Sequence, residues 1–418
     1  MSGSALSRWP TLGIALLLAG CVTQTLRTVD MTPPEQLVQA PSEALLLDVG
    51  IHIFDPNVPE DYDEQIRKSI NPEVRRAEAN FMAYVQKNLL QSSGNWGAVR
   101  VIPRETHAVD LVLSGRILHS DGESIELDVS AVDARGVVWL NKRYEALASK
   151  YAYEDTVPVE IDPFQSVYRD VANDLLAVRA NLTDDEVTEI RRTAEIRFAQ
   201  SFAPDAFGEH VSKTEQRSGK QRFEVQRLPA ENDPMLARVR KIREREYLFI
   251  DTLDEHYGKF HQQMYRSYQD WRSATYDEAI QLKKLRAQAR SRAVAGAAAI
   301  AGGVAAQSSS STVTNVGGYV GIIGGAVSLR SALEKRASAS IHADVLEELG
   351  SSAEAEISPY TIELENESVR LQGSVDKQYE ELRGILRDIY FEEVGLPNPA
   401  IANTEEVAAE ATDARAEQ

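Results

Sequence analysis

The feature that most constrains the fold of this chain is a stretch without proline from Met235 to Ser358. Proline breaks the interior of a helix, so its absence over such a length permits very long helices. The first part of the stretch carries a large apolar residue every three or four positions, with a mean spacing of about 3.7 residues, close to the helical period. We therefore predict a continuous helix of about 55 residues, roughly 80 Å long, whose apolar face is formed by Phe249, Leu253, Tyr257, Phe260, Met264, Tyr268 and Trp271.

Two interpretations of this aromatic face are open. Such a face is typical of a helix that packs against its neighbours, and we expect it to form part of the core. The alternative is an aromatic shelf that binds a ligand.

A second pattern lies within the same stretch, between residues 293 and 329, where charged residues disappear. Small residues recur there at four-residue spacing, which places them on one helix face and lets two helix backbones approach closely. The serine-rich residues 307–311 would form the loop of a helical hairpin. The pattern resembles the glycine-zipper segments of some outer-membrane lipoproteins, and its candidate packing residues are Gly303, Gly317, Gly321 and Gly325.

Membrane insertion and packing in water are both open for this hairpin. Basic residues border its two outer ends, as is typical of a segment that enters lipid beside phosphate groups. Each apolar arm, however, is only about 14 residues or roughly 21 Å long, shorter than the approximately 30 Å hydrocarbon core. A tightly packed hairpin in water or an oligomer contact is the other interpretation.

The first twenty residues have the organisation of an export signal. Arg8 is their only charge, and the apolar run from Leu12 to Leu18 is too short to span a bilayer. The run ends in Leu18-Ala19-Gly20-Cys21, which resembles the lipobox of bacterial lipoproteins. This resemblance implies cleavage between Gly20 and Cys21, with diacylglycerol and an N-acyl chain attached to Cys21. Residues 1–20 are thus a predicted signal peptide.

The same resemblance implies a location in the cell envelope. In lipoproteins of Gram-negative bacteria an aspartate after the cysteine favours the inner membrane, whereas Val22 follows here. The implied location is the periplasmic face of the outer membrane, with membrane lipid as a partner through Cys21. Because Cys21 is the only cysteine, disulfides and thiolate metal sites are excluded.

Charge and motifs narrow the function classes. The formal net charge of −19, from 64 acidic and 45 basic residues, argues against nucleic-acid binding. The chain has no nucleophile-elbow, phosphate-loop, zinc-protease or dinucleotide-binding motif, so we expect no enzyme, no metal and no cofactor besides the covalent lipid. The alternative is a metal site within residues 44–155, with ligands from among His52, His107, His119, Asp48, Asp55 and Asp110.

Residues 21–43, with three prolines, are predicted to form a tether. Residues 44–155 contain the strand, helix, strand and meander of a small α+β sandwich with helices on one face of a mixed sheet. The strands are expected at 44–54, 99–102, 110–118, 124–132 and 137–144, and the helix begins at Asn71-Pro72-Glu73.

The remainder is divided by its periodicity. Residues 160–202 are predicted to be helical, with a capping box from Thr183 to Glu186. A loop or short extended segment at 203–234 precedes the long-helix region 235–357, which holds the hairpin 293–329. Residues 358–396 have the pattern of a β-hairpin and a helix, and 397–418 are expected to be disordered.

Two further resemblances bear on function. The α+β sandwich resembles, over roughly residues 44–150, a domain of the amino-terminal part of the Tol-Pal translocation protein and of the curli secretion lipoprotein. A segment like residues 108–115 enters a hairpin there as well, and the resemblance implies a binding or assembly module. Residues 369–375 resemble the core of the envelope BON module, which is associated with lipid surfaces. The leading hypothesis is an envelope scaffold or assembly factor with a protein partner or self-association through its helices. The alternatives are a membrane-active glycine-zipper lipoprotein and a periplasmic hydrolase.

Overall fold

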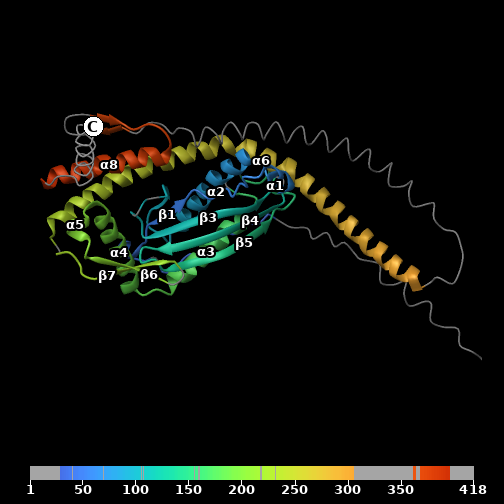
Figure 1. The fold of residues 1–418 in the computed structure, drawn as a ribbon, viewed down its shortest axis with the longest axis horizontal. Coiled ribbons are helices and arrows are strands. Elements are labelled where there is room, and N and C mark those ends of the chain that lie inside the picture. The colour runs from blue at the N-terminus through green and yellow to red at the C-terminus, as the bar shows by residue number, and fades with distance from the viewer. Residues whose placement is uncertain are drawn as a thin grey trace, which may run out of the picture.

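The computed structural model describes residues 29–39, 41–68, 70–104, 106, 108–154, 156–158, 161–216, 219–230, 232–305, 361–363 and 368–395. The architecture is α+β, as predicted, with one mixed sheet, two short hairpins and several helices (Figure 1). The signal segment with Gly20 and Cys21, most of the glycine-rich hairpin and the carboxyl-terminal tail lie outside the described residues.

The main sheet has the strand order β2-β1-β3-β4-β5. Strands β2, β1 and β3 run parallel, and β3, β4 and β5 are antiparallel. This is the predicted mixed sheet. Its strands are β1 Val49–His52, β2 Val99–Ile102, β3 Leu111–Ser120, β4 Ser124–Asp133 and β5 Val138–Leu147. The predicted first strand is shortened, because the 3-10 helix η1 Glu43–Leu45 occupies the start of its range.

One face of the sheet carries the main core. Alternate residues of β3 and β4 are buried, which is the pattern of a strand with one covered face. Helices α2 Pro72–Ser93, α3 Gln165–Ala180 and α4 Asp184–Phe202 contribute to the same core. Asn71 caps α2 by accepting the N–H groups of Glu73 and Val74, and the predicted capping box of α4 is present.

The segment 203–234 has more regular structure than the predicted loop or short extended segment. It contains the short helix α5 Pro204–Phe207 and a hairpin of β6 Val211–Glu215 and β7 Gln221–Val225. A residue of α4 holds the hairpin in place, since the guanidinium of Arg197 lies 3.7 Å from the ring centroid of Phe223. Few of its residues are buried, so it lacks the apolar alternation that would reveal a strand.

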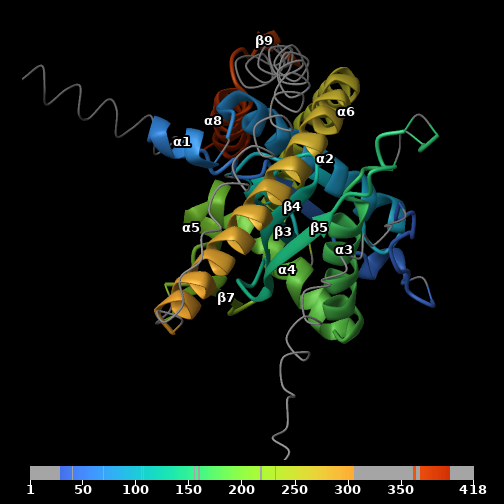
Figure 2. The same cartoon turned by 90° about the vertical axis from the view of Figure 1, so that its right-hand side faces the viewer.

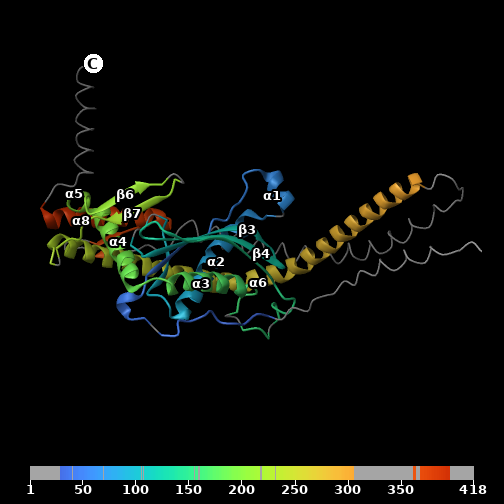
Figure 3. The same ribbon diagram turned by 90° about the horizontal axis from the view of Figure 1, so that it is seen from below.

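Helix α6, Pro234–Ala305, is a single helix of 72 residues, about 108 Å long at 1.5 Å per residue. It is longer than predicted because the helix continues into the glycine-rich segment. The predicted apolar face is confirmed as core from Phe249 to Tyr268, and Trp271 is half-buried. The helix first packs with β2, α4 and α8, then with α2, and its last part extends beyond the body (Figures 1 and 3).

Two peripheral parts complete the fold. The predicted hairpin and helix are present as β8 Thr361–Glu363, β9 Ser368–Arg370 and α8 Val375–Val394. Figure 2 views the molecule from the end toward which α6 projects, with the short helix α1 Tyr62–Lys68 on the side away from α3.

Residues 29–39 and 41–43 of the predicted tether are described, and the first of these two stretches lies against the folded body. Asp30 pairs with Arg169, and the backbone N–H of Glu35 donates to Asn173, both on α3. Leu37 donates its N–H to Asn95 just beyond α2. These contacts shorten the segment that can act as a tether.

Candidate functional site

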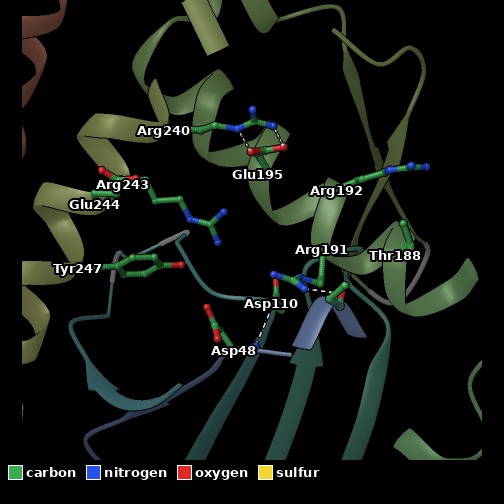
Figure 4. Close-up of a pocket in the computed structure, with 11 residues that line it drawn as sticks. Asp48, Asp110, Thr188, Arg191, Arg192, Glu195, Arg240, Arg243, Glu244 and Tyr247 are labelled. Atoms are coloured by element: carbon green, nitrogen blue, oxygen red, sulfur yellow. Dashed lines mark hydrogen bonds and ion pairs between the residues drawn. The ribbon is translucent and has the colours of Figure 1, made fainter. Parts of the chain in front are cut away.

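A cavity of about 390 Å³ lies where α4 and α6 meet the amino-terminal ends of β1 and β3. Figure 4 draws the side chains that line it. Asp48 comes just before β1 and Asp110 just before β3. Because these strands are parallel neighbours, the residues that precede them meet at one edge of the sheet. The two aspartates form the floor.

The floor is fixed by hydrogen bonds to the backbone. Oδ2 of Asp110 accepts the N–H of Asp48 at 2.9 Å, and Oδ1 of Asp48 accepts the N–H of Ala98 at 2.8 Å. The carbonyl of Asp48 in turn accepts the N–H groups of Asp110 and Leu111, each at 3.1 Å. Burial raises the pKa of Asp110 to about 6, because an apolar environment disfavours the charged carboxylate.

Two arginines form the walls. Arg191 of α4 donates to the carbonyls of Glu43 and Ala44, just before β1. Arg243 of α6 donates through Nε to the carbonyl of Ala108 at 3.1 Å, and the hydroxyl of Tyr247, one helical turn further, donates to the same oxygen. Burial raises the pKa of Tyr247 to about 12, so this phenol stays a donor at neutral pH.

The side chains at the rim of the cavity pair with one another or with the backbone, or point away from the cavity. Arg240 forms a two-fold hydrogen bond to Glu195, at 2.6 and 3.2 Å. The hydroxyl of Thr188 donates to the carbonyl of Asp184. Arg192 is exposed and extends away from the neighbouring Arg191 (Figure 4). Among the described residues, the rim therefore adds no further unpaired cation that points into the cavity.

The four inner charges share an unusual property. Within the described part of the chain, Asp48, Asp110, Arg191 and Arg243 form no ion pair, and each hydrogen-bonds to backbone groups instead. Two carboxylates and two guanidinium groups therefore surround one cavity with no direct ion pair between them, and the positive charges of Arg243 and Arg191 act on Asp110 from a distance. Such an arrangement suits the binding of a molecule that carries charge of both signs.

A second feature of functional interest is the way the body holds α6. Arg272 is fully buried and donates to Oδ2 of Asp162 at 2.8 Å, and its guanidinium lies 3.8 Å from the ring centroid of Tyr268. The hydroxyl of Tyr268 donates to the buried carboxylate of Glu78 on α2, at 2.7 Å. We call these four residues the α6 clamp.

Three of the residues named for the alternative metal site contact other side chains in the structure. Nδ1 of His52 lies 3.0 Å from the hydroxyl of Ser114, His119 pairs with Asp121, and Asp55 pairs with Arg116. His107 lies outside the described residues. In the described ranges no group of three or more metal-ligating side chains could hold an ion.

The predicted lipid and glycine sites fall mostly outside the described residues. Gly20, Cys21, Gly317, Gly321 and Gly325 are not described, whereas Gly303 lies near the end of α6. Across the part of the chain that the structure describes, no helix combines the length and apolar character needed to cross a bilayer.

No family model, no curated protein and no solved structure matches this chain. The resemblances to a lipobox and to envelope-assembly domains accordingly stay predictions.

Sequence reasoning singled out Asp48 and Asp110 but assigned them histidine partners. It missed Arg191 and Arg243, which in sequence look like ordinary solvated cations on helices. The available signal was an aspartate directly before each of two buried strands, since parallel strands bring such positions together.

Proposed function

We propose that this protein is a lipid-anchored scaffold or assembly factor on the periplasmic face of the outer membrane. The observation that carries the proposal is the form of α6, one continuous helix whose first part is fixed in the α+β body and whose last part extends beyond it (Figures 1 and 3). A helix of this kind presents its far end at a defined distance and direction from the body.

The α6 clamp supports this interpretation. Buried charges are expensive to leave unpaired, so Arg272 and Asp162 fix the position of α6 at one point along its length. The tip of the β3–β4 hairpin contacts the helix at the same place, since a Cβ on Gly122 would lie 1.8 Å from the carbonyl oxygen of Arg272. Two helical turns beyond Tyr276, Lys283 of α6 pairs with Glu123 of the same hairpin tip. The helix then extends beyond the body.

The membrane-active alternative draws on the same helix. Residues 293–305 carry no charge and continue α6 with no break. An uncharged helical segment of this kind, which contains Gly303, suits contact with a protein partner as well as with lipid. The two functions differ in what this part of the chain contacts in the cell.

A periplasmic hydrolase is less well supported by the cavity. Asp48 and Asp110 each accept a backbone N–H, and the hydroxyl of Thr188 donates to a backbone carbonyl. Among the lining residues no hydroxyl or thiol is paired with a base, which is the arrangement that activates a nucleophile. The cavity favours binding over bond cleavage.

The proposal is tested by photo-crosslinking in cells. A photoreactive residue is placed at Ile300, near the end of α6, and in a second strain at Gln263, on the part of α6 held by the body. We expect one defined envelope protein to crosslink at position 300 and not at 263. Crosslinks to a second copy alone, or to lipid alone, would favour the membrane-active alternative, and an absence of any adduct at position 300 would contradict both.

The glycine-rich segment is tested in the same assay with Gly321→Leu. We expect this variant to lose the crosslink, because leucine would separate closely packed helices. Gly384→Leu is the matched control, since Gly384 is exposed on α8 with no atom within 4 Å of a Cβ. The anchor is tested with Cys21→Ser, which we expect to abolish metabolic labelling by palmitate and to release the protein from membranes. Retention of both would refute the lipid anchor.

A further inference from the structure

We infer that the cavity between α4 and α6 binds a small zwitterion of the amino-acid type, with its ammonium group on the Asp48–Asp110 floor and its carboxylate between Arg191 and Arg243. This inference is independent of the proposed scaffold function. It rests on the side chains that converge in Figure 4 and on the charges that they leave unpaired.

The charge arrangement favours a ligand that carries both a positive and a negative group. Oδ1 of Asp110 makes no hydrogen bond to any described residue, and neither does Nη1 of Arg243 or Nη2 of Arg191. These groups keep donor and acceptor capacity directed at the cavity. A ligand ammonium on the floor and a ligand carboxylate at the walls would satisfy both sets with charge-assisted hydrogen bonds.

A ligand whose charges all have the same sign fits this cavity less well. A simple anion would approach the guanidinium groups but would also face Asp48 and Asp110, inside a chain of formal net charge −19. A simple cation or metal ion would face Arg191 and Arg243. A zwitterion carries no net charge and therefore avoids both penalties.

The binding groups are held in place before any ligand arrives. Asp110 is locked to the backbone of Asp48, Arg191 to the carbonyls before β1, and Arg243 to the carbonyl of Ala108. Tyr247 donates to that same carbonyl and places its ring as an apolar wall. Pre-ordered side chains lose little conformational entropy on binding, which increases affinity.

The size of the cavity sets the size of the ligand. Its volume of about 390 Å³ falls in the lower part of the range for small-molecule sites. A free amino acid or a dipeptide fits this volume, and both present the same pair of charged groups. Alanine and alanyl-alanine are therefore used as separate probes to distinguish these two sources.

The test is isothermal titration of the full purified chain with alanine, alanyl-alanine, N-acetyl-alanyl-alanine and alanyl-alanine amide. We expect at least one of the two zwitterions to bind. The acetylated dipeptide lacks the ammonium and the amide lacks the carboxylate, so each should bind roughly 10- to 100-fold more weakly. Equal binding of the acetylated probe would overturn the zwitterion assignment, and binding of none of the probes would overturn the site.

Variants place the ligand in this cavity. Arg191→Gln and Asp48→Asn should each weaken binding roughly 10- to 100-fold. Arg266→Gln, a change of the same type at an exposed position of α6 outside the cavity, should leave binding unchanged. Thermal unfolding confirms that each variant is folded. If Arg191→Gln destabilises the fold, Arg243→Lys replaces it, because lysine keeps the charge but loses the fork geometry. Binding that is insensitive to both Asp48→Asn and the arginine variant would refute the site.

Discussion

Oδ2 of Asp110 accepts the backbone N–H of Asp48 at 2.9 Å, and the carbonyl of Asp48 accepts the N–H of Asp110 at 3.1 Å. This reciprocal bond joins the starts of two parallel strands with a side chain, just before their ladder begins. It also explains why an acidic residue is buried at the floor of a cavity. A carboxylate there holds the backbone of Asp48 and still keeps one oxygen for the interior.

The first prediction concerns the pH dependence of stability at Asp110. Burial raises its pKa to about 6, and the charged or titratable groups that face it are Asp48, Arg191, Arg243 and Tyr247. Because the folded state holds this proton to a higher pH than the unfolded state, the contribution of Asp110 is most favourable below pH 4. It is lost as pH rises from 4 through 6, by about 3 kcal/mol in total.

Asp110→Asn keeps an oxygen that can accept the N–H of Asp48 but removes the titration. Urea unfolding of both proteins between pH 4 and 8 gives the difference in the free energy of unfolding. We expect the variant to gain stability relative to the natural chain as pH rises from 4 through 6, and the difference to stay constant above about pH 7. A difference that does not change with pH would show that Asp110 is not a titrating buried acid.

The second prediction has the opposite sign and concerns His52 at the other end of β1. Burial, together with the nearby Arg104, lowers the pKa of His52 to about 4. The unfolded state takes up a proton near pH 6.5, so this residue stabilises the fold above that pH. The contribution is lost as pH falls toward 4, by about 3 kcal/mol. In the same urea experiment His52→Gln should lose this acid sensitivity, whereas an unaltered pH profile would contradict the prediction.

The parts of the fold that the sequence predicted are those in which buried residues recur at the regular spacing of a strand or a helix, or in which a helix end has a capping motif. The alternation in β3 and β4, the capping box at Thr183 and the stripe from Phe249 to Tyr268 all report a buried face or a helix end directly in sequence. Such signals depend on neighbours within one element, so one sequence suffices to detect them.

The parts that were missed depend on contacts between distant segments. The β6–β7 hairpin has few buried residues and is held by Arg197, and residues 29–39 are held by Arg169 and Asn173. The cavity is the clearest case. Arg191 and Arg243 carry no local mark of function, and they face one another only because α4 and α6 both reach the edge of the sheet where β1 and β3 begin.

The third prediction concerns the α6 clamp. Arg272→Met leaves the buried Asp162 without its partner, so the free energy of unfolding should fall by about 3–5 kcal/mol. Arg266→Met, at an exposed position of the same helix, is the matched control and should change stability by less than about 0.5 kcal/mol. The double variant Arg272→Met/Asp162→Asn should recover part of the loss, because it removes the unpaired charge. Equal losses of stability in Arg272→Met and Arg266→Met would contradict a clamp at Arg272.

The last prediction concerns the contact between the β3–β4 hairpin and α6. A Cβ on Gly122 would lie 1.8 Å from the carbonyl oxygen of Arg272 and 2.4 Å from the backbone nitrogen of Tyr276. Both atoms belong to the helix backbone and cannot rotate away, so Gly122→Ala must separate hairpin and helix and should destabilise the protein by about 1–3 kcal/mol. Gly384→Ala is the control, since it meets no atom within 4 Å inside helix α8 and should stabilise by about 0.5–1 kcal/mol. The two variants are therefore expected to shift the urea midpoint in opposite directions. A gain in stability for Gly122→Ala would show that the hairpin and α6 are not in direct backbone contact.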